Sequence, residues 1–319
     1  MISLAIAIVI NIMFLYLAGY PYLEIISILF TTGYSDINYL LIKSSPYVLE
    51  GLAFSIPFIA GVFNIGGEGQ LYLGALSALI ASYYTNSSVI AILAGMMGGF
   101  ILAFLIALLR VYRNVNEVVS AIMLNWFMYY TVSFIITAYI YDPNAPYQSR
   151  PVPPPATIDP ITTFLLSLAI SILIYIFLKY NVIGYMIRVS GISVRSAVYA
   201  GIDPRRSIIL SMSLGGALAG LGGALIPLGV KPHVIDNTMS ALYGIGFLGI
   251  GIGLLGRNNP IGIVISAIFV AGLIIGGQNV ERLTGVPPEI VDMIVGIIII
   301  SMSIPELVRV IRKRGVVER

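Results

Sequence analysis

Apolar stretches long enough to cross a lipid bilayer follow one another along almost the whole chain. No water inside the hydrocarbon core can bond to backbone N–H and C=O groups, so a spanning segment must satisfy them itself, as an α-helix does. Charged residues make up only 10% of the 319 residues, whereas a soluble domain carries about 25%. The chain is therefore predicted to be an all-α, polytopic membrane protein that forms a single transmembrane domain over residues 1–319.

Ten apolar segments are the predicted transmembrane helices. Their approximate bounds are 2–20, 45–63, 69–85, 89–109, 117–141, 161–180, 207–229, 238–256, 260–277 and 289–308. The first segment has neither a basic region before it nor a small-residue cleavage site after it. We therefore expect a retained helix and not a signal peptide.

The basic residues are distributed unevenly between the predicted loops. With both termini in the cytoplasm, thirteen of the 17 Lys and Arg residues lie on the cytoplasmic side. The four on the outer side are Lys43, Arg150, Lys231 and Arg282. Because cytoplasmic loops of membrane proteins are enriched in Lys and Arg, this asymmetry predicts ten spans with both termini cytoplasmic, in the plasma membrane.

A polar, glycine-rich segment, Asn-Ile-Gly-Gly-Glu-Gly-Gln, interrupts the apolar sequence at residues 64–70. The apolar runs beside it, residues 51–63 and 71–84, have 13 and 14 residues. Each would span only about 20 Å as a helix, against about 30 Å of hydrocarbon. Short, glycine-interrupted segments are typical of broken helices that line a polar path through a transporter. The alternative is an interfacial turn between two tilted helices.

Polar side chains in and near this segment are candidate contacts for a solute. An ionised group at the bilayer centre costs roughly 2.5–3.5 kcal/mol or more, which marks Glu68 as a functional candidate. Asn125 is expected about 12 Å from the start of its helix, next to Trp126. An amide beside an indole suits a neutral solute with hydroxyl or ring groups, although an interhelical hydrogen bond is the alternative role for Asn125. The predicted path residues are Asn64, Glu68, Gln70, Asn125 and Trp126.

Two loops are long enough to meet partners. The external loop, residues 142–160, contains seven prolines, which predict an extended, stiff segment poor in hydrogen bonds. It serves either as a docking surface for an extracytoplasmic partner or as a rigid spacer. The internal loop, residues 181–207, is basic, and its residues 190–201 are predicted to form a short helix ending at Gly201, before Pro204. That helix would contact either a partner or anionic lipid headgroups.

Other sequence patterns do not indicate catalysis. Residues 244–249 and 251–256 match GxGxxG, but no strand precedes them, so their glycines are expected to serve helix packing, like the GxxxG pairs elsewhere. The chain has no Walker lysine motif and no cysteine, and its one histidine, His233, lies in an external loop without a metal-binding pattern. An enzyme, a bound metal and a nucleic-acid partner are not expected.

Four ordered motifs, spread between about residues 40 and 307, resemble those of a known family. The segment from Phe63 to Gln70 is similar to FNIGxEGQ, and Asn116-Glu117-Val118-Val119 with Leu124-Asn125-Trp126 is similar to NEV…LN(Y/W). Residues 191–204 are similar to G-x-(N)-x-x-A-A-x-Y-A-G-I, and residues 256–262 are similar to LGRxxPxG. The family is that of the permease subunits of nucleoside and simple-sugar ABC importers, within the branched-chain amino acid and ribose permease superfamily. The chain departs from it at Ser193 and Ser196, where Asn and Ala are usual.

The resemblance implies a permease subunit that forms the translocation path for a nucleoside or simple sugar. ATP and Mg would be bound by separate ATPase subunits, and no cofactor by this chain. The other implied partners are a companion permease (a heterodimer, with a homodimer as the alternative), an extracytoplasmic solute-binding protein and membrane lipid. The residues to which it gives an ATPase-coupling role are Arg188, Arg195, Ala197, Tyr199, Gly201 and Asp203.

Two other functional classes remain open. An ion-coupled secondary transporter of a small polar solute would need several buried Asp, Glu or His residues as a proton relay, and Glu68 is the only good candidate in the sequence. A membrane scaffold without transport activity would need neither the polar segment 64–70 nor Asn125 near the midplane.

Overall fold

The computed structural model describes the backbone of residues 2–317 and the side chains of residues 4–303. This part of the chain is mainly helical, with one short antiparallel sheet. The helices are α1 (Ile2–Leu17), α2 (Tyr22–Thr32), α3 (Ile37–Ile59), α4 (Gly67–Thr85), α5 (Ser88–Arg113), α6 (Glu117–Tyr139), α7 (Pro160–Tyr180), α8 (Val182–Ile192), α9 (Val194–Tyr199), α10 (Pro204–Gly229), α11 (Ile245–Leu255), α12 (Pro260–Thr284) and α13 (Pro288–Val317). The other elements are β1 (Tyr141–Asp142), β2 (Ala145–Ser149) and the 3-10 helix η1 (Pro154–Ala156).

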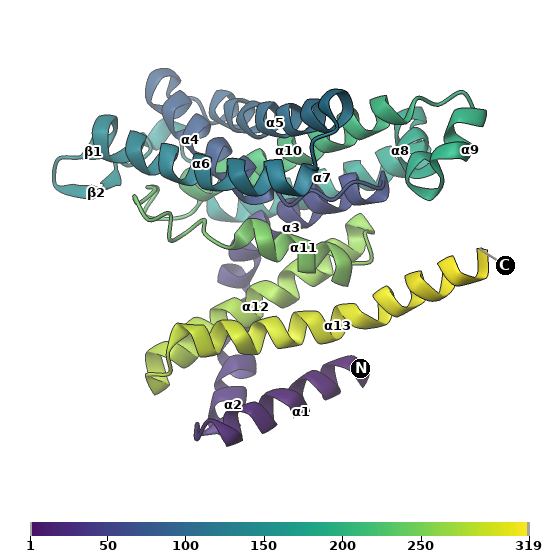
Figure 1. Ribbon diagram of the computed structural model, residues 1–319. Helices are drawn as coiled ribbons and strands as arrows, with labels where there is room; N and C mark the ends of the chain where they lie inside the picture. The colour runs from purple at the N-terminus through teal and green to yellow at the C-terminus, as the bar shows by residue number, and fades with distance from the viewer. Residues whose placement is uncertain (1, 318–319) are drawn as a thin grey trace.

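The helices form a bundle with α3 at its centre (Figure 1). On one side of α3 lie α4, α5, α6 and α10; on the other lie α11 and α12, followed by α13, α1 and α2. The β1–β2 hairpin is at one end of the bundle and α8–α9 at the other. Because α1 begins and α13 ends on the α8–α9 side, both ends of the described backbone lie at the same end of the molecule.

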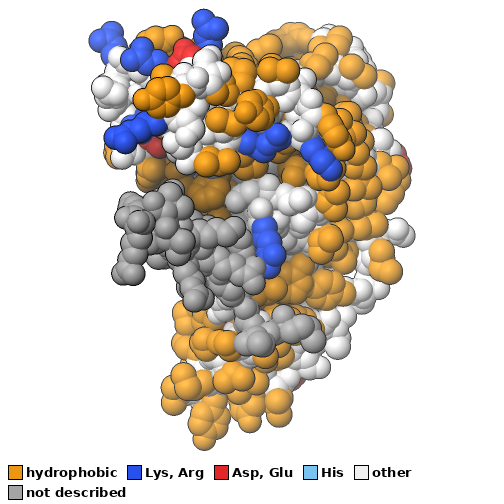
Figure 2. All heavy atoms as spheres, turned by 90° about the vertical axis from the view of Figure 1, so that its right-hand side faces the viewer, with side chains coloured by type: hydrophobic (Ala, Val, Ile, Leu, Met, Phe, Trp, Pro, Cys, Tyr) orange, Lys and Arg blue, Asp and Glu red, His pale blue; other side chains and the backbone are white. Residues whose placement is uncertain are grey.

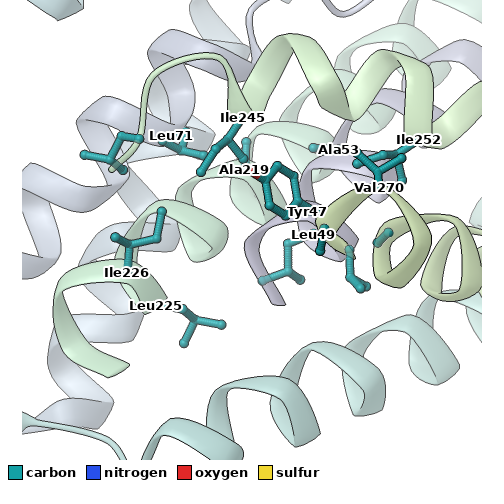
Figure 3. Packing of buried hydrophobic residues seen from close by; sticks show 14 of the residues in the cluster. Tyr47, Leu49, Ala53, Leu71, Ala219, Leu225, Ile226, Ile245, Ile252 and Val270 are labelled. Carbon is teal, nitrogen blue, oxygen red and sulfur yellow. The ribbon is translucent and has the colours of Figure 1, made fainter. Parts of the chain in front are cut away.

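The central position of α3 explains why it is buried on all sides. Every residue from 44 to 57 is buried, whereas a surface helix buries only one stripe. Side chains from α4, α10, α11 and α12 pack around α3 (Figure 3). The residues labelled there are Tyr47, Leu49 and Ala53 of α3, Leu71 of α4, Ala219, Leu225 and Ile226 of α10, Ile245 and Ile252 of α11, and Val270 of α12.

Glycines bring α4, α5 and α10 into backbone contact. A Cβ atom added at Gly99 would lie 2.1 Å from the carbonyl oxygen of Gly216, and one added at Gly220 would lie 2.2 Å from that of Gly95. A Cβ at Gly74 would also meet the Gly220 backbone, at 2.4 Å. No side chain fits at such separations, so the prediction that the GxxxG pairs serve helix packing is confirmed.

Fewer helices meet the criteria for crossing a membrane than the ten predicted segments. Among the described residues, five are long and apolar enough: α5, α6, α7 together with η1, α10 and α12. Helices α2 and α3, which are bent by 89° at their junction, form a sixth span if taken together. Helix α2 lies between two predicted segments and was not expected from the sequence. These helices make the chain a polytopic helical membrane protein.

The predicted span 238–256 is wrong in its first half. Helix α11 has only 11 residues, about 16 Å of helix. The residues before it form turns, and Met239 and Gly244 have positive φ angles of 53° and 83°. Because a left-handed residue cannot continue a right-handed helix, the apolar run is broken at this point. The expected short helices beside segment 64–70 are instead α3 and α4, with 23 and 19 residues.

The external loop 142–160 makes more hydrogen bonds than its prolines predict. The N–H of Ser149 donates to the carbonyl oxygen of Ile235 at 2.8 Å, and that of Val152 donates to His233 at 2.9 Å. The prolines occupy other positions of the loop and leave these two N–H donors in place. The prediction of a segment poor in hydrogen bonds is therefore wrong, because the loop pairs with the chain that follows α10.

We predict that Gly99→Leu lowers the stability of the bundle. The new side chain would collide with the Gly216 backbone, and overpacking of this kind costs roughly 1–3 kcal/mol or more. Thermal unfolding in detergent should show a melting temperature several degrees lower. Gly296→Ala is the matched control, because a Cβ at Gly296 meets no atom within 4 Å. An unchanged melting temperature for Gly99→Leu would contradict the packing argument.

Candidate functional site

The polar segment 64–70 lies in the protein interior. The amides of Asn64 and Gln70 bond to each other twice, Nδ2 of Asn64 to Oε1 of Gln70 and Nε2 of Gln70 to Oδ1 of Asn64, both at 3.1 Å. Asn64 also donates to the carbonyl oxygen of Ala53 on α3 at 3.2 Å. Both amide side chains are buried. The segment is therefore a hydrogen-bonded connection between α3 and α4, and not a solvated turn.

The glycines of this segment make room for polar neighbours. A Cβ added at Gly67 would lie 2.6 Å from Oε2 of Glu50, and one at Gly69 would lie 2.8 Å from Oδ1 of Asn125. Both glycines belong to the regular helix α4. Their role is thus to allow close approach, and not to permit irregular backbone.

Asn125 on α6 caps the start of α4. Its Oδ1 accepts the N–H of Gly69 at 2.9 Å, and its Nδ2 donates to the carbonyl oxygen of Ile65 at 2.9 Å. The first N–H groups of a helix have no partner within the helix, and an Asn side chain is well suited to accept one of them. Asn125 therefore makes the interhelical hydrogen bonds that were the alternative to solute binding.

Glu68 caps the start of α11 in the same way. Its Oε1 accepts the N–H of Gly244 at 2.5 Å, and its Oε2 accepts those of Gly246 at 2.8 Å and Phe247 at 3.3 Å. The hydroxyl of Tyr72 donates to Oε1 at 2.6 Å. The N-terminus of a helix carries a partial positive charge, which favours an anion there. The buried carboxylate of Glu68 is thus placed at the point where the apolar run is broken.

A second buried acid, Glu50, was missed in the sequence. Its side chain is 1% exposed and packs against Gly67 and against Gly249 on α11. Its Oε1 has no hydrogen-bond partner among the described residues. The sequence did contain an indication of this residue, since Glu50 is an acidic residue inside the predicted span 45–63. Within the described part of the chain, no three His, Asp or Glu side chains are grouped so that they could hold a metal ion.

An aromatic surface lies directly beside these buried polar groups. Trp126 is 50% exposed on α6 and contacts the rings of Tyr129 and Tyr130 at centroid distances of 5.8 and 6.2 Å. A shallow hollow of about 30 Å³ opens on this surface, and its lining includes Glu68 and Asn125. Of the predicted path residues, the structure places Glu68, Asn125 and Trp126 around one hollow, whereas Asn64 and Gln70 are not part of its lining.

The predicted cytoplasmic helix 190–201 is divided between two helices. Ser193 ends α8 and caps α9, where its Oγ accepts the N–H of Ser196 at 3.3 Å. Because Asn and Ser are both good N-cap residues, the departure from the family pattern at this position preserves the cap. Gly201 follows α9 with a positive φ of 74°.

The α8–α9 end presents an exposed basic and apolar surface. Arg195 is exposed, Arg188 is half-buried, and Tyr199 is 93% exposed. Ile192 and Val198 beside them are also exposed. Figure 2, which faces this end of the molecule, shows several Lys and Arg side chains and few acidic ones.

Two predicted coupling residues have internal roles. Ala197 is completely buried, so its side chain packs against the chain itself and is not part of the surface. Asp203 caps α10, where its Oδ1 accepts the N–H of Arg205 at 2.9 Å, and it lies 3.6 Å from Nε of Arg206. Of the predicted set, Arg195 and Tyr199 are the residues most available to a partner.

We predict that Glu68→Ala lowers the melting temperature more than Glu68→Gln. Alanine leaves three N–H groups of the α11 start without an acceptor, at a cost of roughly 1–3 kcal/mol for each one that stays dry. Glutamine retains one acceptor oxygen. Thermal unfolding of the three proteins measures the order, with Glu289→Gln, an exposed acid on α13, as the control. Equal melting temperatures for Glu68→Ala and the unchanged protein would refute the capping role.

Comparison with known proteins is consistent with this architecture. The family model described as "Branched-chain amino acid transport system / permease component" matches residues 36–303. The guanosine ABC transporter permease protein NupP of Bacillus subtilis is 29% identical over 93% of this chain and 91% of its own length. The nucleoside ABC transporter permease protein NupB of Lactococcus lactis is 29% identical over 83% and 78%.

A sugar transporter is also among the relatives. The glucose ABC transporter permease protein of Haloferax volcanii is 28% identical over 86% of this chain and 78% of its own length. No solved structure was found to match the chain. On the family match and these relatives, the chain belongs to the branched-chain amino acid transport system / permease component family and is a multi-pass plasma-membrane permease subunit of an ABC importer.

Proposed function

We propose that this permease carries a nucleoside or a simple sugar across the membrane, in company with a second, different permease. The names of the relatives support this class of solute, since guanosine, nucleosides and glucose all contain a sugar ring. Such solutes need hydroxyl-bonding groups for the sugar and flat apolar surfaces for the rings.

The observation that carries the proposal is the aromatic surface of α6 beside the Glu68–Asn125 hollow. Trp126 and Tyr130 are exposed there and stack with an interplanar angle of 27°. Apart from this surface, α6 also exposes Phe127 and Phe134, and exposed apolar surface of this extent indicates contact with lipid or a partner. We place the solute path between this surface and the companion permease. Asn64 and Gln70 support the path from behind.

In this proposal the hairpin end faces outward and the α8–α9 end faces the cytoplasm. The ten predicted segments then all contribute to one transmembrane domain, residues 1–319, in which α11 and its preceding turns form one broken segment. The common location of the two chain ends in Figure 1 and the basic surface in Figure 2 support this orientation.

The partners follow from the same orientation. ATPase subunits, which bind the ATP and Mg, would dock on the α8–α9 surface, and an extracytoplasmic solute-binding protein would dock at the hairpin end. Membrane lipid would cover the remaining apolar surface. Closure of the ATPases would move α8–α9 against α3 and α10, with which α8 is in contact, and so change access to the path.

The alternative drawn from the sequence, an ion-coupled secondary transporter, does not agree with the family match. Glu50 adds a second buried carboxyl group near Glu68, and a proton relay needs several such groups. A direct test of the energy source separates the two mechanisms.

We predict that uptake into liposomes requires ATP hydrolysis by partner subunits. The permease is reconstituted with its ATPases and binding protein, and uptake of radiolabelled guanosine and glucose is measured with and without MgATP. Trp126→Ala should reduce uptake several-fold without changing the melting temperature, since Trp126 is half exposed. Asn125→Leu should lower the melting temperature, since two backbone groups lose their partner.

Two results would overturn this function. One is accumulation of solute by the permease alone, driven by a proton or sodium gradient. The other is uptake by Trp126→Ala at the unchanged rate for every solute tested.

We also predict that Tyr199→Ala weakens binding of the ATPase. Exposed aromatic residues often dominate protein interfaces, and removing one reduces affinity about tenfold or more. Co-purification of the ATPase and solute-stimulated hydrolysis are the measurements. The matched control is Tyr84→Ala, since Tyr84 is 85% exposed at the end of α4 away from α8–α9. Wild-type ATPase recovery with Tyr199→Ala would place the docking surface elsewhere.

A further inference from the structure

A cavity of about 410 Å³ lies beside α3, next to the turns that precede α11. Helices α3, α11, α12 and α13, the turns before α11, and Ile226 and Val230 at the end of α10 form its walls. Its volume is in the range of small-molecule sites, about 300–1,000 Å³.

The lining changes from polar to apolar along α3, α12 and α13. Lys43 on α3 is followed one turn deeper by Tyr47, and Asp292 on α13 is followed by Val295. On α12, Gln278 is at the polar end, and the residues one turn deeper are isoleucines. Tyr47 lies near Ile245 in Figure 3. The cavity is therefore amphipathic, with a polar mouth and an apolar floor.

The mouth continues into a second, polar hollow. That hollow has a volume of about 400 Å³ and shares Ile275 and Gln278 with the first. It is lined by Asp36, Asn279 and Arg282 from the bend between α2 and α3 and from the end of α12. A ligand in the cavity can thus keep its polar part in contact with water or the headgroup region.

The two charges at the mouth have opposite signs and do not pair with each other. No ion pair joins Lys43 or Asp292 to any described side chain. The ammonium of Lys43 lies over the ring of Tyr39, 5.9 Å from the centroid. Lys43 is half-buried and Asp292 is exposed. The half-buried charge of Lys43 is costly without an ionic partner, so a ligand anion is favoured beside it, and a cation on the same ligand can pair with Asp292 at the surface.

We propose that this cavity binds a zwitterionic phospholipid with a primary ammonium headgroup. Its phosphate lies by Lys43, its ammonium by Asp292, and the first part of one acyl chain lies on the apolar floor. Met293, beside Asp292, is exposed and offers apolar surface for the rest of the lipid. The bilayer is the source because the cavity lies between apolar helices that the membrane surrounds.

This lipid site is separate from the proposed solute path. Tyr243 lines both the cavity and the hollow beside Trp126 and so stands between them. Lys43, Asp292 and Gly296 have no part in the path or in the α8–α9 surface. Lipid retention and solute uptake are measured separately, so the failure of one proposal does not decide the other.

The test measures lipid retained by the purified permease complex. The complex is delipidated, exposed to phosphatidylethanolamine or phosphatidylglycerol at matched concentration, and examined by native mass spectrometry. Three variants probe the cavity: Lys43→Met, Asp292→Asn and Gly296→Leu. At Gly296 an added side chain starts in open space, so leucine fills the cavity without a clash. The controls are Lys231→Met and Glu289→Gln, which change exposed charges outside the cavity.

The two lipids distinguish the contacts. We expect Lys43→Met to weaken retention of both lipids about tenfold or more, since both carry the phosphate. Asp292→Asn should weaken retention of phosphatidylethanolamine alone, since phosphatidylglycerol has no ammonium. Gly296→Leu should abolish retention of both and leave the melting temperature unchanged or higher. Soluble glycerophosphoethanolamine is added as a competitor, and failure to displace the lipid shows that the acyl chain is needed.

The proposal is overturned if all three cavity variants retain phosphatidylethanolamine as the controls do. It is also overturned if Asp292→Asn reduces both lipids equally, because the ammonium contact is then absent. Full displacement by the soluble headgroup would assign the cavity to a water-borne zwitterion and not to a lipid. If Lys43→Met or Asp292→Asn unfolds, lipid retention by Gly296→Leu decides the test.

Discussion

The contact between the Glu68 carboxylate and the N-terminus of α11 is the constraint on which the centre of the molecule depends. A helix that begins inside the bundle has N–H groups that neither its own turns nor water can satisfy. Glu68 accepts three of them, and Asn125 does the same for one N–H at the start of α4. Two helix starts are thus capped by side chains from other helices. This arrangement fixes the relative positions of α4, α6 and α11.

The same contact links the hollow beside Trp126 to the cavity at Lys43. Glu68 lines the hollow beside Trp126, and the turn that it holds, at Tyr243 and Gly244, lines the larger cavity. A displacement of the α11 start would therefore change the shape of both. A short, capped half-helix is a suitable moving part for alternating access, because only a few hydrogen bonds must rearrange at its free end.

The molecule combines a tightly packed interior with exposed aromatic side chains at separate surfaces. The layer of α4, α5 and α10 is held by glycine contacts that admit no added side chain, and α3 is buried on every side. Such interfaces are rigid. The exposed aromatic residues of α6 and the exposed Tyr199 of α9 lie on the outside of this core. A rigid core with two exposed surfaces suits a subunit that must transmit the movement of one partner to another.

The amino-acid sequence was sufficient to predict the class of the protein and the bounds of three helices. The predicted segments 69–85, 117–141 and 161–180 differ from α4, α6 and α7 by two residues or fewer, because apolar length and polar ends are local properties. Only the tertiary structure decided that α11 starts late, that Glu50 is buried next to segment 64–70, and that Asn125 bonds to the backbone. These features depend on which helices are neighbours, and no local pattern records which partner will satisfy a buried polar group.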